Sequence, residues 1–516
     1  MKLNYKRTIL VGFAFFLICA FWQAYDATIP VILTNKYGMS QFWSGVIMAL
    51  DNVLALFMLP LFGALSDKCK SKHGKRTPYI IFGTVIAAVA LVALSVVDNI
   101  QLKKISDYTT LDDPTTLSVI YQEQADTTLK TPEGESFVLK DIFTEEEFSK
   151  IPVNVVDSET GKNVVNADYT NYVSPAREAC VAAVTEKDPS ALIIFVALLL
   201  VVLISMSTFR SPAVALMPDV TVKPLRSKAN AVINLMGTAG GIIVLVLGII
   251  FSTSAVKNSF MSYTVYYAVI AGLMLVSLLI FLLTVREPAW AKQMQEDTVR
   301  YGIEEEEPQE QKRKLTSGEK KSLILILLSV ALWYFGYNAV TSKYAVYATN
   351  ILDMDYNTTM LIAQGAAIVA YLPAGIVASK IGRKKTILAG VVILGLAFGV
   401  ASFMRAGSSV MLMNVLFAAA GIGWATINVN SFPMAVELST GADVGKYTGY
   451  YYTASMAAQT LTPLLSGFLM DNVADTILFP YAAVFVALAI VTMLFVKHGD
   501  NKIEAKKGLD AFDIED

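Results

Sequence analysis

The sequence predicts an all-α membrane protein whose twelve transmembrane helices form two six-helix bundles. The chain of 516 residues is 55% hydrophobic and only 16% charged, whereas a soluble domain usually carries about 25% charged residues. Its mean hydropathy is +0.53. Stretches without a single charge recur along the chain, at 77–97, 191–209, 231–256, 264–285, 322–342 and 478–496. Each is long enough to cross roughly 30 Å of hydrocarbon as a helix, so the chain is expected to span the membrane many times.

The positions of the cations predict the orientation of these helices. Clusters of Lys and Arg all fall on one side of the predicted spans, at 2–7, 68–76, 223–228, 312–314, 380–385 and 502–507. The short loops on the other side contain little beyond Lys36 and Lys257. Because cytoplasmic loops carry an excess of Lys and Arg, we expect a multi-pass protein of the cell (plasma) membrane with both termini in the cytoplasm.

Two segments outside the predicted spans divide the chain. The runs "ESFVLKDIF" and "IPVNVVDSETGKNVVNADY", with the turn-like "TPEG", predict a small β-rich appendage in the first of them. Its acidic, Thr-rich composition leaves a disordered loop as the alternative. The predicted organisation is 1–97 (N-terminal bundle, helices 1–3), 98–189 (extracytoplasmic insertion), 190–285 (N-terminal bundle, helices 4–6), 286–320 (charged cytoplasmic linker), 321–497 (C-terminal bundle, helices 7–12) and 498–516 (cytoplasmic tail).

The two predicted bundles repeat short sequence features. "LPLFG" (59–63) precedes the first basic cluster, and "LPAG" (372–375) precedes its thinner copy. "MPDVTVKPLRSKAN" (217–230) and "FPMAVELSTGADVGKYTG" (432–449) occupy corresponding loops of the two halves. Paired halves of parallel topology are the plan of transporters that rock two bundles around a site at the membrane midplane. The repeat therefore favours a transporter.

Composition argues against an enzyme. The three cysteines have no metal-like or disulfide-like spacing, and neither of the two histidines lies in an apolar run. The chain has no nucleotide-binding glycine loop and no nucleophile–His set. We expect no metal and no cofactor other than a coupling ion, H⁺ or Na⁺. The expected partners are a small-molecule substrate and the lipid bilayer, with no nucleic acid, and the expected state is a monomer.

The basic loop after the second predicted span resembles a known family. Gly63 and Asp67 followed by Gly74-Lys75-Arg76 resemble the loop signature of the major facilitator superfamily. The resemblance implies that family's fold of two six-helix bundles. By physical reasoning, Asp67 can pair with Arg76 or with free N–H groups at a helix end, which would form a polar latch that keeps the cytoplasmic side closed. The alternative is that the cations only anchor the loop inside.

Further segments resemble the sugar-symporter branches of that superfamily. Arg210, Pro218-Asp219 and Asn230 resemble the glycoside–pentoside–hexuronide cation symporters and the related sucrose-transporter branch, as do "GWATINVNSFPM" (423–434) and "YTGYYYTASMAAQTLTPLLSG" (447–467). The resemblance covers nearly all predicted spans but not the insertion. It implies cation-coupled symport of a sugar or glycoside by alternating access.

The latch and its copy give a set of gating candidates. The second copy departs from the first, because Ser379-Lys380 stands where an acid would be expected. The gating candidates of both halves are Gly63, Asp67, Lys75, Arg76, Asp219, Gly375, Arg383 and Glu437.

Charges inside the predicted spans are candidates for cation coupling, since each costs several kcal/mol unless it is paired or wetted. Asp26 and Asp51 lie on consecutive spans, each about 12–15 Å from the outer end at 1.5 Å per residue. Two carboxylates at one level can share a proton or bind sodium, and the melibiose-type symporters carry their cation-site aspartates on these helices. Arg210 and Lys343 are the opposing charges, although Lys343 has the alternative of reaching the outer surface.

Aromatic and amide side chains at depth are candidates for sugar binding, because sugars present apolar C–H faces and rings of hydroxyls. Tyr and Trp also line membrane interfaces without any binding role. Tyr334, Asn430, Tyr451, Tyr452 and Gln459 share this chemistry. The predicted substrate-binding residues are Trp22, Gln23, Tyr25, Asn52, Asn234, Trp333, Tyr337, Asn338, Lys343, Gln364, Trp424 and Asn428.

Three functions remain open from sequence. The first is a secondary active, H⁺- or Na⁺-coupled sugar symporter, and the second is a proton-coupled exporter of drugs or metabolites on the same fold. The third is a sensor that does not transport and whose insertion is the working part.

Overall fold

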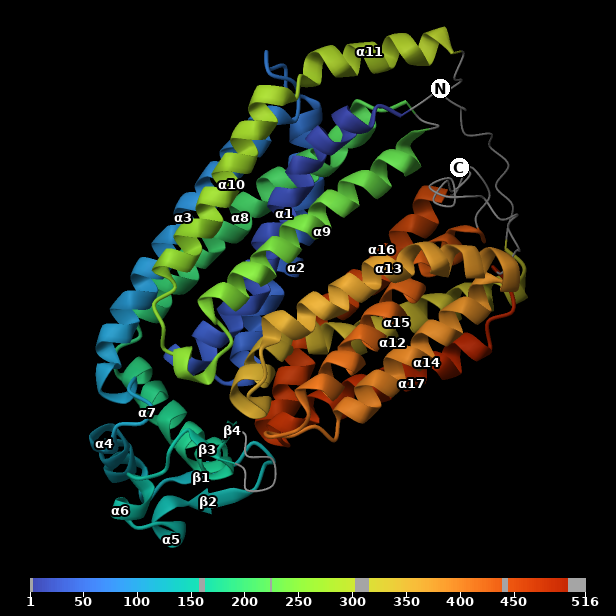
Figure 1. The fold of residues 1–516 in the computed structure, drawn as a ribbon. Helices are drawn as coiled ribbons and strands as arrows, with labels where there is room; N and C mark the ends of the chain where they lie inside the picture. Colours follow the sequence, from blue (N-terminus) through green and yellow to red (C-terminus); the bar gives the residue numbers. More distant parts are fainter. Residues whose placement is uncertain (1–2, 157–162, 223–224, 302–314, 439–443, 500–516) are drawn as a thin grey trace.

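The computed structural model describes residues 3–156, 163–222, 225–301, 315–438 and 444–499. Twelve long helices within this part of the chain form two groups of six (Figure 1). The N-terminal bundle contains α1 (Tyr5–Val31), α2 (Gln41–Asp67), α3 (Thr77–Lys104), α8 (Ser190–Asp219), α9 (Arg226–Phe251) and α10 (Thr264–Thr284). The C-terminal bundle contains α12 (Ser317–Tyr347), α13 (Tyr356–Ile381), α14 (Arg383–Ala401), α15 (Val410–Val436), α16 (Val444–Asn472) and α17 (Leu478–Leu494).

Ten of these helices are, over the described residues, long and apolar enough to cross a membrane. The other two, α13 and α16, have comparable lengths but do not pass the same test. The structure therefore confirms an all-α, multi-pass membrane protein, whereas the count of twelve spans stays a prediction. The basic residues at 223, 312–314 and 502–507, on which the predicted orientation partly depends, lie outside the described residues.

The sequence explains where several helices begin. Ser40 accepts a hydrogen bond from the backbone N–H of Trp43 at the start of α2, and Asp355 caps α13 in the same way. At α12, Thr316 and Glu319 cap each other's backbone reciprocally. Such caps satisfy N–H groups that would otherwise lack a partner, so the cap residues mark where these helices begin.

The two bundles touch at one end and diverge at the other (Figure 1). We call the end beside the insertion the outer end and the opposite end the inner end. At the outer end, the Asp471 carboxylate accepts hydrogen bonds of 2.7 and 2.8 Å from the backbone N–H groups of Gln41 and Phe42. Two π-helical turns also meet there, Ile32–Lys36 after α1 and Ala348–Leu352 after α12. The structure is thus in a conformation that is closed at the outer end.

The two π-helical turns are joined by a reciprocal pair of amides. Asn35 Nδ2 donates to Asn350 Oδ1 at 3.1 Å, and Asn350 Nδ2 donates to Asn35 Oδ1 at 2.7 Å. Each asparagine follows a threonine, Thr34 or Thr349, in the same place in its half. The repeat in the sequence therefore reappears as a contact between the halves.

A fully buried ion pair braces the outer end of the N-terminal bundle. Lys36 Nζ lies 2.7 Å from Asp98 Oδ2, and both side chains are 0% exposed. The same ammonium donates to the Met261 carbonyl at 2.7 Å, and it lies 4.5 Å from the centre of the Tyr263 ring. Lys36 was expected only as an outlying cation on this side, and the structure gives it a structural role.

The insertion is a small folded unit at one end of the molecule (Figure 1), and it has its own apolar core. Its core includes Leu117, Phe148, Tyr169 and Val181, all nearly inaccessible to solvent. Its elements are α4 (Pro114–Gln124), β1 (Thr128–Lys130), β2 (Ser136–Val138), α5 (Leu139–Ile142), α6 (Glu145–Phe148), β3 (Asn154–Val156), β4 (Asn163–Val165) and α7 (Ser174–Lys187).

The insertion is less β-rich than the sequence predicts. Its strands form two antiparallel pairs, β1 with β2 and β3 with β4, and each strand is three residues long. Most of its helix lies in α4 and α7, and "LKDI", expected to continue a strand, instead forms the short helix α5 from Leu139. The expected turn "TPEG" is present, whereas the segment "SETGK" (158–162) lies outside the described residues.

Candidate functional site

A cavity lies between the two bundles at mid-depth. It encloses about 660 Å³ when the space open to solvent is counted. Four of the long helices contribute most of its wall: α1, α2, α12 and α16. The lining residues are Trp22, Tyr25, Asp26, Met48, Asp51, Asn52, Arg210, Asn338, Thr341, Ser342, Gln459 and Pro463.

The cavity brings together the three candidates for cation coupling, Asp26, Asp51 and Arg210. Asn52 Nδ2 donates to Asp51 Oδ1 at 2.9 Å, which orients that carboxylate. The Arg210 guanidinium carbon lies 5.7 Å from the centre of the Trp22 ring. Among the described side chains, no ion pair within 4 Å joins Arg210 to either aspartate. The arrangement can therefore hold a small cation at the carboxylates and a polar ligand beside the guanidinium.

Three polar atoms of the cavity wall are buried and lack a hydrogen-bond partner in the structure. They are Trp22 Nε1, the Tyr25 hydroxyl and Asn338 Nδ2. Buried polar groups are nearly always hydrogen-bonded in proteins, and leaving one without a partner costs about 1–3 kcal/mol. The three residues line the cavity, but these atoms are themselves almost inaccessible to solvent, so a polar molecule in the cavity would reach them only after the side chains rearrange.

Several predicted substrate contacts lie near the cavity without lining it. Gln364 Nε2 donates to Gln23 Oε1 at 2.6 Å, and Gln23 Nε2 donates to the Tyr356 hydroxyl at 3.2 Å, so these amides connect the bundles. Tyr337 and Trp424 stack on each other with ring centres 3.6 Å apart and planes 2° apart. The two glutamines belong to the interface between the bundles, whereas the Tyr337–Trp424 stack lies within the C-terminal bundle against its core.

Other predicted contacts serve the packing of the bundles. Trp333 is 0% exposed inside the core of the C-terminal bundle. Asn234 Nδ2 donates to the carbonyl of Asn230 one turn earlier, at 2.9 Å. Asn428 does not line the cavity. The structure does not bring these three predicted residues into the cavity.

Lys343 lies at the outer contact between the bundles. Its side chain is fully buried, and Nζ donates to the backbone carbonyl of Gln41 at 2.5 Å. The alternative that this lysine reaches the outer surface is therefore wrong. Lys343 and Asp471 together hold the first turn of α2 against the C-terminal bundle.

Four lining residues were absent from the sequence-based candidates: Met48, Thr341, Ser342 and Pro463. Thr341 and Ser342 stand three and four residues after Asn338, which puts all three on one face of α12. That spacing could have identified both residues. The sequence offers no comparable signal for Met48 or Pro463.

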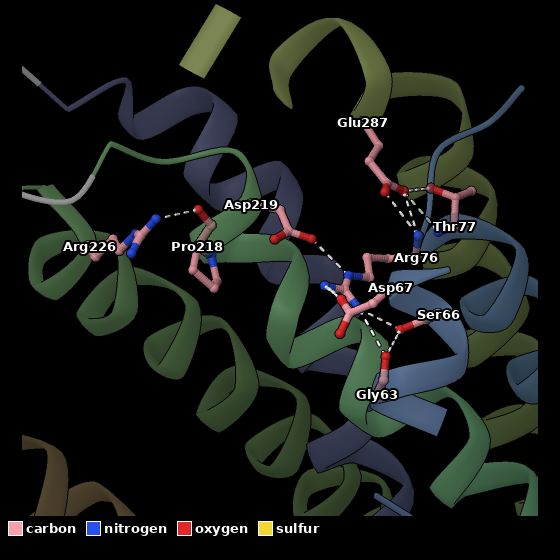
Figure 2. A network of polar contacts seen from close by, with 9 residues as sticks. All are labelled: Gly63, Ser66, Asp67, Arg76, Thr77, Pro218, Asp219, Arg226 and Glu287. Atoms are coloured by element: carbon pink, nitrogen blue, oxygen red, sulfur yellow. Dashed lines mark hydrogen bonds and ion pairs between the residues drawn. The ribbon is translucent and has the colours of Figure 1, made fainter. Parts of the chain in front are cut away.

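A second polar centre lies at the inner end of the N-terminal bundle, around Arg76 (Figure 2). The guanidinium contacts Asp67 Oδ1 at 2.5 Å and Asp219 Oδ2 at 2.7 Å. It also donates to Ser66 Oγ at 2.5 Å and to the Gly63 carbonyl at 3.4 Å. Burial acts to lower the pKa of Arg76, but the hydrogen bonds and charges of Asp219 and Asp67 outweigh it and raise that pKa.

Glu287 completes this network, although the sequence did not single it out (Figure 2). Its carboxylate accepts hydrogen bonds from the backbone N–H groups of Arg76 and Thr77, each at 2.9 Å, and from Thr77 Oγ1 at 2.7 Å. It thereby caps α3 from the first turn of α11 (Glu287–Arg300). Gly74 is required beside it, because φ is +109° there and a Cβ would lie 2.2 Å from Glu287 Cδ.

The Arg76 network lies within the N-terminal bundle and α11 and does not cross to the other bundle (Figure 2). Lys75 is exposed at its edge. The C-terminal half keeps a related ion pair between Arg383 and Glu437, at the equivalent helix ends. Gly375 makes only an ordinary contact there, since a Cβ would lie 3.8 Å from Val429 Cγ1.

The two bundles, the polar cavity between them and the basic loops define the architecture of a membrane transporter. The chain belongs to the Major Facilitator Superfamily, whose model matches residues 179–371 and 355–511. A second model, described as MFS/sugar transport protein, matches residues 10–102. The members of this family and the solved structures of this fold are transporters rather than enzymes.

Individual relatives add detail. The sucrose transport protein SUC4 of Arabidopsis thaliana is 35% identical over 60 residues, which is 12% of the chain and 12% of that relative. The inward open conformation of the xylose transporter XylE from E. coli shares 16% identity, covers 99% of both chains and gives a TM-score of 0.57. The nucleoside transporter NupG shares 11% identity over 95% of this chain and 100% of that one, with a TM-score of 0.51. At these identities, the solved structures show the fold alone.

Proposed function

We propose that this transporter carries a sugar or glycoside by symport with H⁺ or Na⁺, through alternating access of the central cavity to the two sides of the membrane. The observation that carries this proposal is the mixed wall of the cavity, where aromatic rings lie beside charged, amide and hydroxyl side chains. A sugar hydroxyl accepts hydrogen bonds from an indole or amide N–H, and an aromatic face covers the apolar side of the ring.

The coupling ion is proposed to bind at Asp51, with Asp26 as its neighbour. Both carboxylates line the same cavity as the proposed sugar site. Because the ion and the sugar would share one cavity, any increase in sugar affinity caused by the ion is matched by the same increase in ion affinity caused by the sugar. No cofactor other than this ion is proposed.

The relatives support a sugar as the substrate but do not identify which sugar. The matching segment of SUC4 belongs to a protein named for sucrose transport, and one model is described by sugar transport. A bacterial homologue of the iron transporter ferroportin has the same fold at a TM-score of 0.57 and 11% identity. The fold therefore serves different solutes, and the cavity chemistry has to decide between them.

The test compares two modes of transport in vesicles with imposed pH or sodium gradients. Asp51→Asn should abolish uphill accumulation of the sugar while counterflow down its gradient survives, because amides and aromatics bind the sugar without an ion. Asp26→Asn should give a milder loss if the two groups share one site. Asp107→Asn, an exposed carboxylate of the insertion, is the matched control. Full uphill transport by Asp51→Asn would sink the proposal, and efflux driven by an inward proton gradient would favour the exporter.

The proposal includes the surroundings of the protein. We place it in the plasma membrane as a monomer, with both termini in the cytoplasm and the insertion outside. Helix α1 begins and helix α17 ends at the inner end (Figure 1), which supports placing both termini on the same side of the membrane. Labelling of an exposed insertion cysteine, Lys150→Cys, on intact cells would test that orientation.

A further inference from the structure

The tip of the β1–β2 hairpin reaches from the insertion to the C-terminal bundle. Residues 131–135 form the tip, where the Gly134 N–H donates to the Thr131 carbonyl and the Thr131 N–H donates to the Glu135 carbonyl, both at 2.8 Å. Gly134 has φ of +88°, a conformation that favours glycine. The tip is therefore a defined turn rather than a loose loop.

Three contacts join the tip to loops at the outer end of the C-terminal bundle. The backbone N–H of Thr476, between α16 and α17, donates to the Pro132 carbonyl at 3.2 Å. Arg405, between α14 and α15, donates from Nε to Glu133 Oε1 at 2.9 Å. A Cβ on Gly134 would lie 2.0 Å from the Val473 carbonyl oxygen, so the two backbones are in close contact.

The rest of the insertion is fastened to the N-terminal bundle. It follows α3 and precedes α8 in the chain. Lys104 at the end of α3 pairs with Asp188 at 2.5 Å, and Gln101 donates to Thr185 Oγ1 at 3.1 Å. Arg177, 3% exposed, donates to three backbone carbonyls between 108 and 111, which ties the first loop to α7. The insertion will therefore move with the N-terminal bundle.

We propose that the hairpin tip is a clamp that holds the outer ends of the two bundles together and must release whenever the cavity opens outward. A unit fixed to one bundle and docked on the other resists their separation. The insertion also contacts the C-terminal half away from the tip, because Asn350 donates to Glu178 of α7 at 3.4 Å. The proposal rests on alternating access and not on which solute or ion is carried. Its test therefore uses no substrate.

The test traps the clamp and measures outward opening. The three native cysteines are replaced, and Ser342→Cys in the cavity wall serves as the reporter for a membrane-impermeant maleimide. The reagent is applied to the face on which Lys150→Cys is labelled. The pair Pro132→Cys and Thr476→Cys should form a disulfide on oxidation and reduce reporter labelling about tenfold or more, and reduction should restore it. Failure of this pair to form a disulfide, or unchanged labelling once it has formed, would overturn the clamp.

Control variants separate the clamp from general damage to the insertion. Ser118→Cys with Glu145→Cys joins α4 to α6 inside the insertion, where the two side chains are hydrogen-bonded. That disulfide should leave reporter labelling unchanged, and an equal loss of labelling there would overturn the proposal.

A charge exchange tests the same contact without cross-linking. Glu133 and Arg405 are 56% and 42% exposed, so their pair should contribute modestly. Glu133→Arg and Arg405→Glu should each raise reporter labelling roughly two- to fivefold. Combining them restores the pair with reversed charges and should return labelling to the starting level. Labelling that rises further in the double variant would contradict the clamp.

Discussion

Replacing Glu287 with glutamine should loosen the start of α3 and with it the anchor of Arg76. The carboxylate is 3% exposed and accepts three hydrogen bonds from Arg76 and Thr77. A glutamine keeps one acceptor oxygen, and its NH₂ group faces N–H donors. Bonds to a charged acceptor contribute about 1.5–3 kcal/mol each, and a charge at a helix N-terminus adds about 0.3–1 kcal/mol. We expect a loss of about 2–4 kcal/mol in the local opening free energy.

Hydrogen exchange measures this loss at the donors themselves. The amides of Arg76 and Thr77 are the groups that Glu287 protects. If exchange follows local opening, a loss of about 2–4 kcal/mol makes them exchange roughly 30- to several hundred-fold faster. Peptides that cover 68–82, analysed by mass spectrometry, would report the change.

Two variants bracket the Glu287 prediction. Glu296→Gln alters an exposed carboxylate on the same helix, 3.8 Å from Lys292, and should leave these amides unchanged. Asp67→Asn removes a carboxylate that is 61% exposed, so its effect should stay below about fivefold. If the amides of Arg76 and Thr77 exchange at the wild-type rate in Glu287→Gln, or faster in Asp67→Asn than in Glu287→Gln, then Glu287 is not the main anchor.

Three further predictions follow from contacts described above. Lys36→Met should lower the free energy of unfolding by about 3–5 kcal/mol because it leaves Asp98 buried and unpaired, and the double variant Lys36→Met with Asp98→Leu should recover most of this loss. Thermal unfolding of both variants measures the difference, and equal losses would contradict the reasoning. A fragment of residues 100–187 should show dispersed amide resonances because the insertion has its own core, whereas a random-coil spectrum would indicate that it depends on the bundles. Gly45→Val should push α2 away from α16, because a Cβ at this position would lie only 2.1 Å from the Pro463 carbonyl oxygen. Labelling of the Ser342→Cys reporter from the outer side should therefore rise, and unchanged labelling would show that α2 adapts to the larger side chain.

The sequence was most informative where a residue is costly in its surroundings. Asp26, Asp51 and Arg210 stood out because charges in hydrocarbon need a wet or paired environment, and the structure places all three on one cavity. The two bundles were predictable for a similar reason, because long uncharged stretches have few alternatives to a membrane helix. The basic loop led to Arg76 through its unusual density of charge.

The sequence could not supply the rotation of each helix or the contacts between distant segments. Trp22 and Trp333 both lie within long helices, yet one lines the cavity and the other fills a core. Depth alone does not tell which face of a helix a side chain occupies, particularly where the whole surface is apolar. Glu287 was missed because it lies 211 residues from Arg76 and looks like an ordinary linker acid. The turn "TPEG" at the hairpin tip was predicted, but its contact with the C-terminal bundle was not, because Glu133 and Arg405 lie far apart in the chain and no local pattern links them.

The reciprocal amides of Asn35 and Asn350 have a consequence for how the transporter responds to its surroundings. An amide pair carries no net charge, so neither the membrane voltage nor the salt concentration changes the work needed to part it. The Arg76 network at the inner end consists of full charges, and its exposed part weakens as ionic strength rises. These two contacts should therefore differ in their sensitivity to salt and voltage. Salt at the inner end would weaken the exposed part of the Arg76 network, whereas the contact between the two asparagines would separate with the same ease at any membrane voltage.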